Sequence, residues 1–107
     1  MAGGRWEGPA IESLIDAAPQ GTQASFFRTA ADAEIDLLLE EPGPRASSAI
    51  EIKRSLAPKI ERGFHLACND VKPGRCGVVY GGTERLAIAE GVEAASLVDS
   101  CVEVAVG

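Results

Sequence analysis

Asp36, Glu51 and Lys53 bring two carboxylates and an ammonium group into one short stretch of the chain. Carboxylate oxygens are the ligands that hard cations such as Mg²⁺ and Mn²⁺ prefer in proteins. On one side of a sheet, these side chains would form an oxygen-ligand site for such a cation, with a cationic group beside it. Their types and spacing therefore predict a metal site with Asp36 and Glu51 as ligands.

Two predicted strands, 33–40 and 48–53, position these side chains, and a turn rich in proline and glycine at 41–45 joins them. Side chains alternate between the two faces along a strand. Ile50 and Ile52 therefore point into a core, whereas the glutamate and the lysine point the other way. Pairing of the strands can bring the aspartate onto the same face. A solvent-exposed strand alternates in the same way without holding a site, so this second interpretation stays open.

The rest of the chain predicts a mixed α/β fold. The expected sheet has a three-strand meander and a parallel strand reached through a crossover, with helices flanking it. Residues 1–4 are expected to be loose, and the regular helix is expected to begin near Pro9. The expected elements are a helix at about 6–18, strands at 24–29, 33–40 and 47–53, a helix at 59–71, strands at 76–80 and 85–89, and a final helix after a capping box at 96–99.

The composition predicts a single cytoplasmic domain spanning residues 1–107. At this length, an apolar fraction of 46% suffices for a core without disulfides or structural metal. Cys68, Cys76 and Cys101 have no C-x-x-C spacing, so we expect reduced thiols. We find neither a signal peptide nor an apolar run of membrane-spanning length, and we expect no membrane partner.

A net charge of −6 argues against general binding to polyanions, although the argument weakens if several carboxylates bind metal. Arg54, Lys59 and Arg62 nevertheless add, with Lys53, a local excess of positive charge directly after the candidate site. These residues are candidates for contacts to the phosphate backbone of DNA. Alternatively, these residues lie on an ordinary solvent-exposed segment that leads into a helix and bind no ligand.

A set of motifs extends over nearly the whole chain: Trp6-Glu7-Gly8, Ile11-Glu12, the segments 24–29, 33–37 and 49–53, and the runs 53–59 and 63–68. Together they resemble the PD-(D/E)XK nuclease-like superfamily. More narrowly, the chain is similar to the C-terminal domain of unknown function that follows a P-loop AAA ATPase module in many bacterial ATP-binding proteins.

The resemblance implies a restriction-endonuclease-like fold, with Asp36, Glu51 and Lys53 at the positions of the nuclease signature. It also implies that Glu7 is a further catalytic carboxylate on the first helix, with Glu12 as the other match. In active members, such carboxylates hold one or two Mg²⁺ ions, and the lysine helps to orient or deprotonate the attacking water. We expect no ATPase module in this chain, because it has no G-x-x-x-x-G-K-[ST] motif.

Two functions follow as hypotheses. The first is Mg²⁺-dependent hydrolysis of nucleic-acid phosphodiester bonds, or nucleic-acid binding by a module derived from such a nuclease. The second is a non-catalytic interaction domain that docks to an AAA ATPase or to a second copy of itself. The acidic charge balance favours the second hypothesis, and the intact signature residues favour the first.

Overall fold

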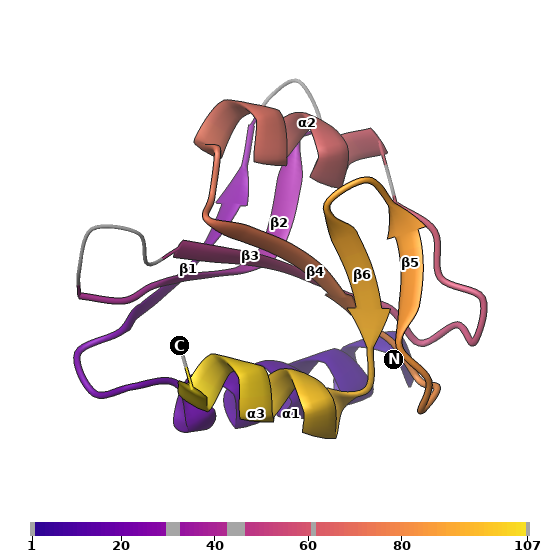
Figure 1. Cartoon of the computed structure of the whole chain (residues 1–107), viewed down its shortest axis with the longest axis horizontal. Helices are drawn as coiled ribbons and strands as arrows, with labels where there is room; N and C mark the ends of the chain where they lie inside the picture. Colours follow the sequence, from indigo (N-terminus) through magenta and orange to yellow (C-terminus); the bar gives the residue numbers. More distant parts are fainter. Residues whose placement is uncertain (1, 30–32, 43–46, 61, 107) are drawn as a thin grey trace.

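Three helices separate two groups of three strands in the described part of the computed structural model (Figure 1). It describes residues 2–29, 33–42, 47–60 and 62–106, with the backbone alone for 2–7. Most of the turn expected at 41–45 lies outside the described residues. In chain order, the elements are α1 (Ala2–Ala17), β1 (Gln23–Arg28), β2 (Glu34–Glu40), β3 (Ser47–Ile52), α2 (Arg62–Val71), β4 (Arg75–Val79), β5 (Leu86–Ala89), β6 (Val92–Ala95) and α3 (Leu97–Val106).

The strands form one mixed sheet in the order β1-β2-β3-β4-β6-β5. The first three strands are an antiparallel meander, β4 is parallel to both β3 and β6, and β5 is an antiparallel edge strand. The predicted mixed α/β fold, with a meander and a parallel strand, is confirmed. The prediction missed β6, a strand of four residues. Gly91, with φ of 76°, lies in the turn between β5 and β6.

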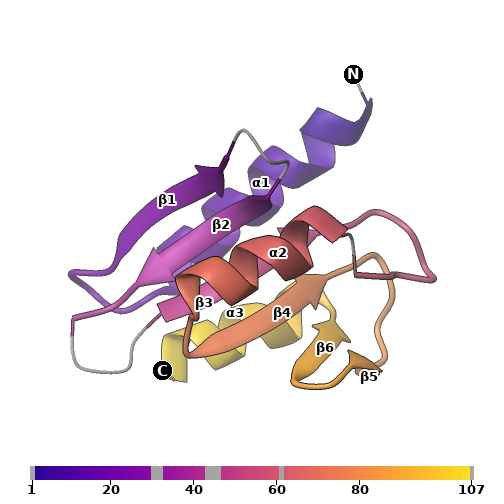
Figure 2. The same ribbon diagram turned by 90° about the horizontal axis from the view of Figure 1, so that it is seen from above.

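Helices cover both faces of this sheet. α1 and α3 lie side by side on one face, and α2 lies on the other (Figures 1 and 2). The alternation of β3 explains this division, since Ile50 and Ile52 pack toward α1 and α3, whereas Ala49 packs toward α2. The two isoleucines are 6% and 3% exposed, so their predicted direction into a core is confirmed.

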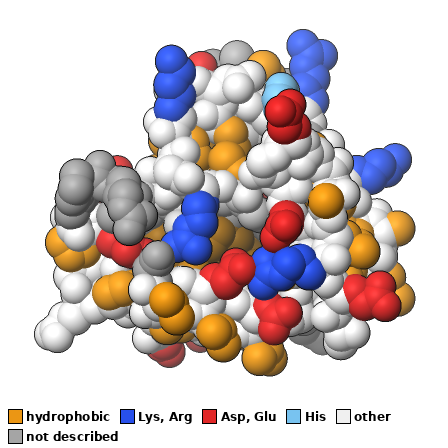
Figure 3. All heavy atoms as spheres, viewed as in Figure 1, with side chains coloured by type: hydrophobic (Ala, Val, Ile, Leu, Met, Phe, Trp, Pro, Cys, Tyr) orange, Lys and Arg blue, Asp and Glu red, His pale blue; other side chains and the backbone are white. Residues whose placement is uncertain are grey.

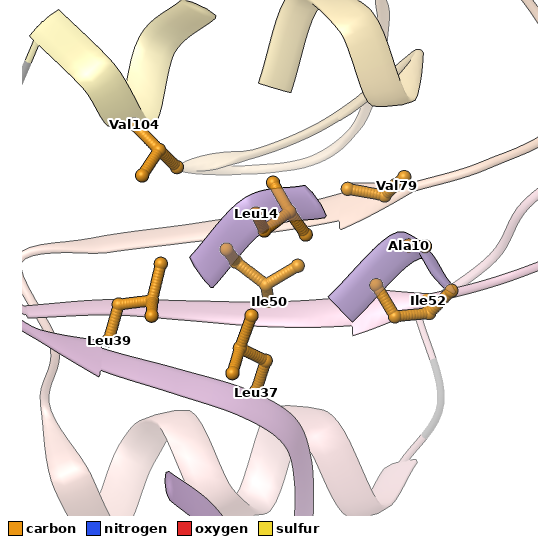
Figure 4. Close-up of a cluster of buried hydrophobic side chains, with 8 residues drawn as sticks. All are labelled: Ala10, Leu14, Leu37, Leu39, Ile50, Ile52, Val79 and Val104. Atoms are coloured by element: carbon orange, nitrogen blue, oxygen red, sulfur yellow. The ribbon is translucent and has the colours of Figure 1, made fainter. Parts of the chain in front are cut away.

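The larger hydrophobic cluster lies between the sheet and the layer formed by α1 and α3 (Figure 4). Leu14 from α1 and Val104 from α3 pack there against aliphatic side chains from β2, β3 and β4. Full burial of one such side chain stabilises a fold by about 1.5–3 kcal/mol. The members are Ala10, Leu14, Leu37, Leu39, Ile50, Ile52, Val79 and Val104.

The first two helices begin at residues other than those expected. α1 begins at Ala2, so the prediction of a loose start and of a helix beginning near Pro9 was wrong. Proline removes one helical donor but keeps a helical φ, and the burial of Ala10 and Leu14 against the sheet retains the helix. α2 begins at Arg62 rather than near residue 59. In the described part of the chain, no helix is both long and apolar enough to cross a membrane.

Candidate functional site

The signature residues lie at one end of the β2–β3 pair. The antiparallel register sets Leu37 opposite Ile50, so Asp36 and Glu51 are the next residues of the two strands beyond that pair. Lys53 directly follows β3. Its positive charge acts to lower the pKa of Asp36. The strands therefore bring all three residues to one end of the sheet.

A backbone group of the neighbouring strand holds Asp36 in place. The N–H of Ile52 donates a hydrogen bond to Oδ2 of Asp36 at 2.9 Å. Burial raises the pKa of Asp36 above its ordinary value, and the nearby charge of Glu34 adds to that rise. The hydrogen bond and the charges of Lys53 and Arg28 act in the opposite direction. Since the ionised carboxylate is disfavoured here, a cation beside it would stabilise the charged form.

Glu51 and Lys53 form an ion pair, with 3.2 Å between Oε2 and Nζ. The glutamate is 8% exposed and shares its face of β3 with Ala49, under α2. The lysine backbone N–H donates to the carbonyl oxygen of Val79 at 2.7 Å, which fastens the end of β3 to β4. Backbone bonds on both sides of β3 therefore fix the positions of these two charged side chains.

Asp36 and Glu51, the two carboxylates predicted to bind Mg²⁺, lie on neighbouring strands, and metal binding by them stays a prediction. Among the described residues, no group of three or more His, Cys, Asp and Glu side chains lies close enough to hold a metal ion. Mg²⁺ commonly takes one or two protein carboxylates and completes its octahedron with waters and substrate phosphates. Glu12 is exposed on α1 and does not complete a three-residue group with the other two. The side chain of Glu7 lies outside the described part of the molecule.

The basic residues predicted to contact phosphates lie in the loop that follows β3 and at the start of the next helix. Arg54 and Lys59 lie in this loop, Arg62 begins α2, and all three are exposed. The loop after β4 approaches closely, since a Cβ on Gly81 would lie 2.9 Å from the carbonyl oxygen of Arg54. The basic residues thus follow the same end of β3 as the carboxylates. Their contact with nucleic acid stays a prediction.

A protein-family comparison matches residues 2–99 to the domain of unknown function DUF4143. The chain belongs to this family. The matched segment contains every candidate residue described above. Comparisons with curated proteins and with solved structures found no match. The roles of residues in this DUF4143 domain are therefore argued from its own geometry.

Sequence reasoning missed one close pair of reactive groups, the thiols of Cys68 on α2 and Cys76 on β4. Their sulfurs lie 3.1 Å apart. Cys68 falls on the apolar stripe of the predicted helix and Cys76 opens a predicted strand, so both were expected near the core. Their meeting depends on the rotation of the helix over the sheet, which the stripe alone does not specify.

A cleft of about 540 Å³ opens on the other side of the sheet, lined by β3 to β6 and by α3. Figure 3 shows hydrophobic atoms at the bottom of a hollow near the centre of this view, with charged side chains around it. Arg85 lies at its edge and pairs with Glu93 at 3.0 Å and with Glu103 at 2.7 Å. The signature residues do not line this cleft, so it is separate from the candidate metal site.

Proposed function

We propose that this DUF4143 domain is a PD-(D/E)XK-type module that hydrolyses nucleic-acid phosphodiester bonds with Mg²⁺ or Mn²⁺. The observation that carries the proposal is the strand pairing that brings Asp36, held by the N–H of Ile52, to the same end of the sheet as the Glu51–Lys53 ion pair. Burial of charged side chains costs free energy that their pairing repays only in part. A role in chemistry therefore explains this polar cluster better than a role in packing.

Each residue has a distinct role in this proposal. Asp36 and Glu51 would hold the ion, the first already oriented by the N–H of Ile52 and the second by its largely buried position. When bound, the ion stabilises charge at the phosphorus and lowers the pKa of its water. Lys53 would orient the attacking water as an ammonium group, or deprotonate it as the neutral amine, because its Nζ already lies 3.2 Å from Oε2 of Glu51.

The exposed basic residues would contribute binding rather than chemistry. Arg54, Lys59 and Arg62 follow the same end of β3, where a phosphate backbone approaching the carboxylates would pass. Contacts of this kind position a nucleic acid without reading its sequence. They would also offset the repulsion between the phosphates and a chain with a net charge of −6.

A cleavage assay tests the proposal directly. Fluorescently labelled single-stranded and double-stranded DNA and RNA would be incubated with the purified chain in Mg²⁺, in Mn²⁺ and in EDTA. We expect cleavage that requires the metal and that is lost in Asp36→Asn and in Lys53→Ala, while both variants keep the circular-dichroism spectrum of the wild type. Cleavage that persists in both folded variants would assign the activity to other residues or to a contaminant.

A second candidate function is a non-catalytic interaction domain that docks to an AAA ATPase or to a second copy of this chain. The observation that favours it is an apolar stripe on α3. Val98, Val102 and Val106 are 72%, 58% and 82% exposed, and their spacing of four residues places them on one side of the helix. Light scattering of wild type and Val102→Ser tests self-association. Under this hypothesis, Mg²⁺ has no effect on the protein.

A further inference from the structure

Cys68 and Cys76 form a thiol pair that the proposed nuclease chemistry does not use. The two sulfurs share a hydrogen bond at 3.1 Å. Both cysteines are half-buried, so small reagents can reach them from solvent. Neither forms a disulfide in the structure, and the short segment 69–75 connects them.

The two thiols are carried by different elements, Cys76 by a central strand and Cys68 by the last turn of a helix. Cys76 lies in a central strand and pairs with Ala49 of β3 and with Val92 of β6. Cys68 lies in the last turn of α2, where its carbonyl oxygen accepts a hydrogen bond from the N–H of Lys72 at 2.8 Å. A disulfide needs the sulfurs to approach by about 1 Å from their present separation. A rotation of the cysteine side chain at the helix end supplies a movement of that size.

The surroundings distinguish the two sulfurs. The hydrogen-bonded contact with Cys68 lowers the pKa of Cys76 to about 7, although burial acts in the opposite direction. The same hydrogen bond, followed by burial and by the negative charges of Cys76 and Glu51, raises the pKa of Cys68. The lowered pKa favours Cys76 as the sulfur that reacts first.

We propose that Cys68 and Cys76 are a site of reversible oxidation, at which a hydroperoxide converts the two thiols into an intramolecular disulfide. The proposal does not depend on the proposed nuclease activity. It commits to hydrogen peroxide as the simplest oxidant of this class, because a small uncharged molecule can reach a half-buried sulfur.

The reaction balances in two steps. The thiolate of Cys76 attacks one peroxide oxygen, the O–O bond breaks, and hydroxide leaves, which forms a sulfenic acid on Cys76. The sulfur of Cys68 then attacks the sulfur of Cys76, and its proton leaves with the sulfenic hydroxyl as water. The two sulfurs together lose two electrons, and the peroxide gains them. A dithiol reductant reverses the change by exchange through a mixed disulfide.

The test uses the reduced full chain treated with hydrogen peroxide near pH 7.5. Free thiols are then alkylated and the sites are read by peptide mass spectrometry. We expect Cys68 and Cys76 to become protected together in a linked peptide, while Cys101 stays alkylated, and we expect dithiothreitol to restore both thiols. Cys101 is the internal control, because burial raises its pKa and no described sulfur forms a hydrogen bond with it.

Serine variants separate the two roles, since serine has nearly the shape of cysteine. Cys68→Ser should leave a sulfenic acid on Cys76 that dimedone labels, because no second thiol is present to resolve it. Cys76→Ser should slow oxidation of Cys68 at least tenfold, and Cys101→Ser should change nothing. Oxidation of wild-type Cys76 and Cys101 at equal rates, or a wild type that yields only disulfides between chains, would overturn the proposal.

Discussion

The two faces of the sheet differ in the kind of side chain that they bury. Under α1 and α3, the large cluster is aliphatic throughout. Under α2, the same strands carry Glu51 and Cys76 beside apolar residues, and the helix adds Cys68. Both faces bury apolar side chains, but only the face under α2 combines them with a buried carboxylate and with two thiols in contact. Substitutions should separate accordingly into those that unfold the chain and those that alter its chemistry.

The strongest test of this division compares two adjacent residues of β3. Ile52→Asp places a carboxylate in the aliphatic cluster, where Ile52 is 3% exposed, and we expect it to abolish folding. The loss combines a removed core side chain, at about 2–5 kcal/mol, with a buried charge that has no counter-ion. For a small domain, this approaches the entire free energy of unfolding.

Glu51→Gln is the matched control on the opposite face. Glutamine keeps an oxygen that accepts a hydrogen bond from Lys53, and the lysine side chain is 24% exposed and can reach water. We therefore expect a cooperative melt close to that of the wild type by circular dichroism. Comparable melts for both variants would show that the two faces do not differ as described.

The contrast between the faces could be predicted in part from the sequence. Alternation along β3 gave the correct direction of Ile50 and Ile52, because a period of two is a local property of the strand. The predicted start of α1 was wrong, because tertiary packing overrides the helix-breaking tendency of Pro9. The hydrogen bond from Ile52 to Asp36 depends on how β2 and β3 lie at their ends, and local patterns do not encode it.

The candidate site shows the same limit. Its residue types were recognised from the spacing of Glu51 and Lys53 and from the resemblance to nucleases, but their contact distances were not. The nearness of Cys68 to Cys76 could not be predicted, because it requires the angle at which α2 crosses the sheet. Sequence therefore predicted which strands carry polar groups, and the packing of elements far apart in the chain decides which groups meet.

Asp36 provides a second, smaller test. Asp36→Ala removes the acceptor of the Ile52 N–H, which should cost about 1–3 kcal/mol of unfolding free energy. Asp36→Asn keeps an acceptor oxygen and removes the charge, so at pH 7 it should be as stable as the wild type or more stable. Urea denaturation of the three proteins measures both differences.

The pH dependence of this comparison has a definite sign. Burial raises the pKa of Asp36, so ionisation is less favourable in the folded chain than in the unfolded chain. Below its ordinary pKa of 3.8, the aspartate is protonated in both the folded and the unfolded chain, and its burial carries no charge penalty. As pH rises through the raised pKa of the folded state, the carboxylate ionises and the free energy of unfolding falls. The advantage of asparagine should appear near neutral pH and vanish near pH 3.5. An advantage that grows toward acid pH would contradict this assignment.

Mg²⁺ should stabilise the wild type if Asp36 and Glu51 bind it. For about 10 mM Mg²⁺ and an assumed Kd of about 1 mM, the gain is about 1.4 kcal/mol. In a domain of this size, the melting temperature should rise by roughly 5–10 °C. The rise should disappear in Asp36→Asn and in Glu51→Gln but remain in Lys53→Ala, because lysine is not a ligand. A wild-type melting temperature that is unchanged by Mg²⁺ and Mn²⁺ would remove the basis of the nuclease proposal.

The smallest effect per residue is expected at the basic positions that follow β3. If Arg54, Lys59 and Arg62 contact phosphates, each alanine substitution should weaken DNA binding and lower the salt dependence by roughly one unit of slope per lost contact. Fluorescence anisotropy across a series of salt concentrations measures both quantities. The effect should be similar for unrelated sequences, since phosphate contacts carry no base readout.

Arg75→Ala is the matched control for this measurement. Arg75 is equally exposed but begins β4, and it pairs in register with Ser48 at the opposite end of β3 from the carboxylates. Its removal lowers the net charge by the same amount, so a general loss of electrostatic attraction would affect it equally. A slope that changes only for the residues after β3 would place the nucleic acid at the carboxylate end of the sheet. Equal changes at both ends, or none, would assign the basic run to an ordinary solvated surface.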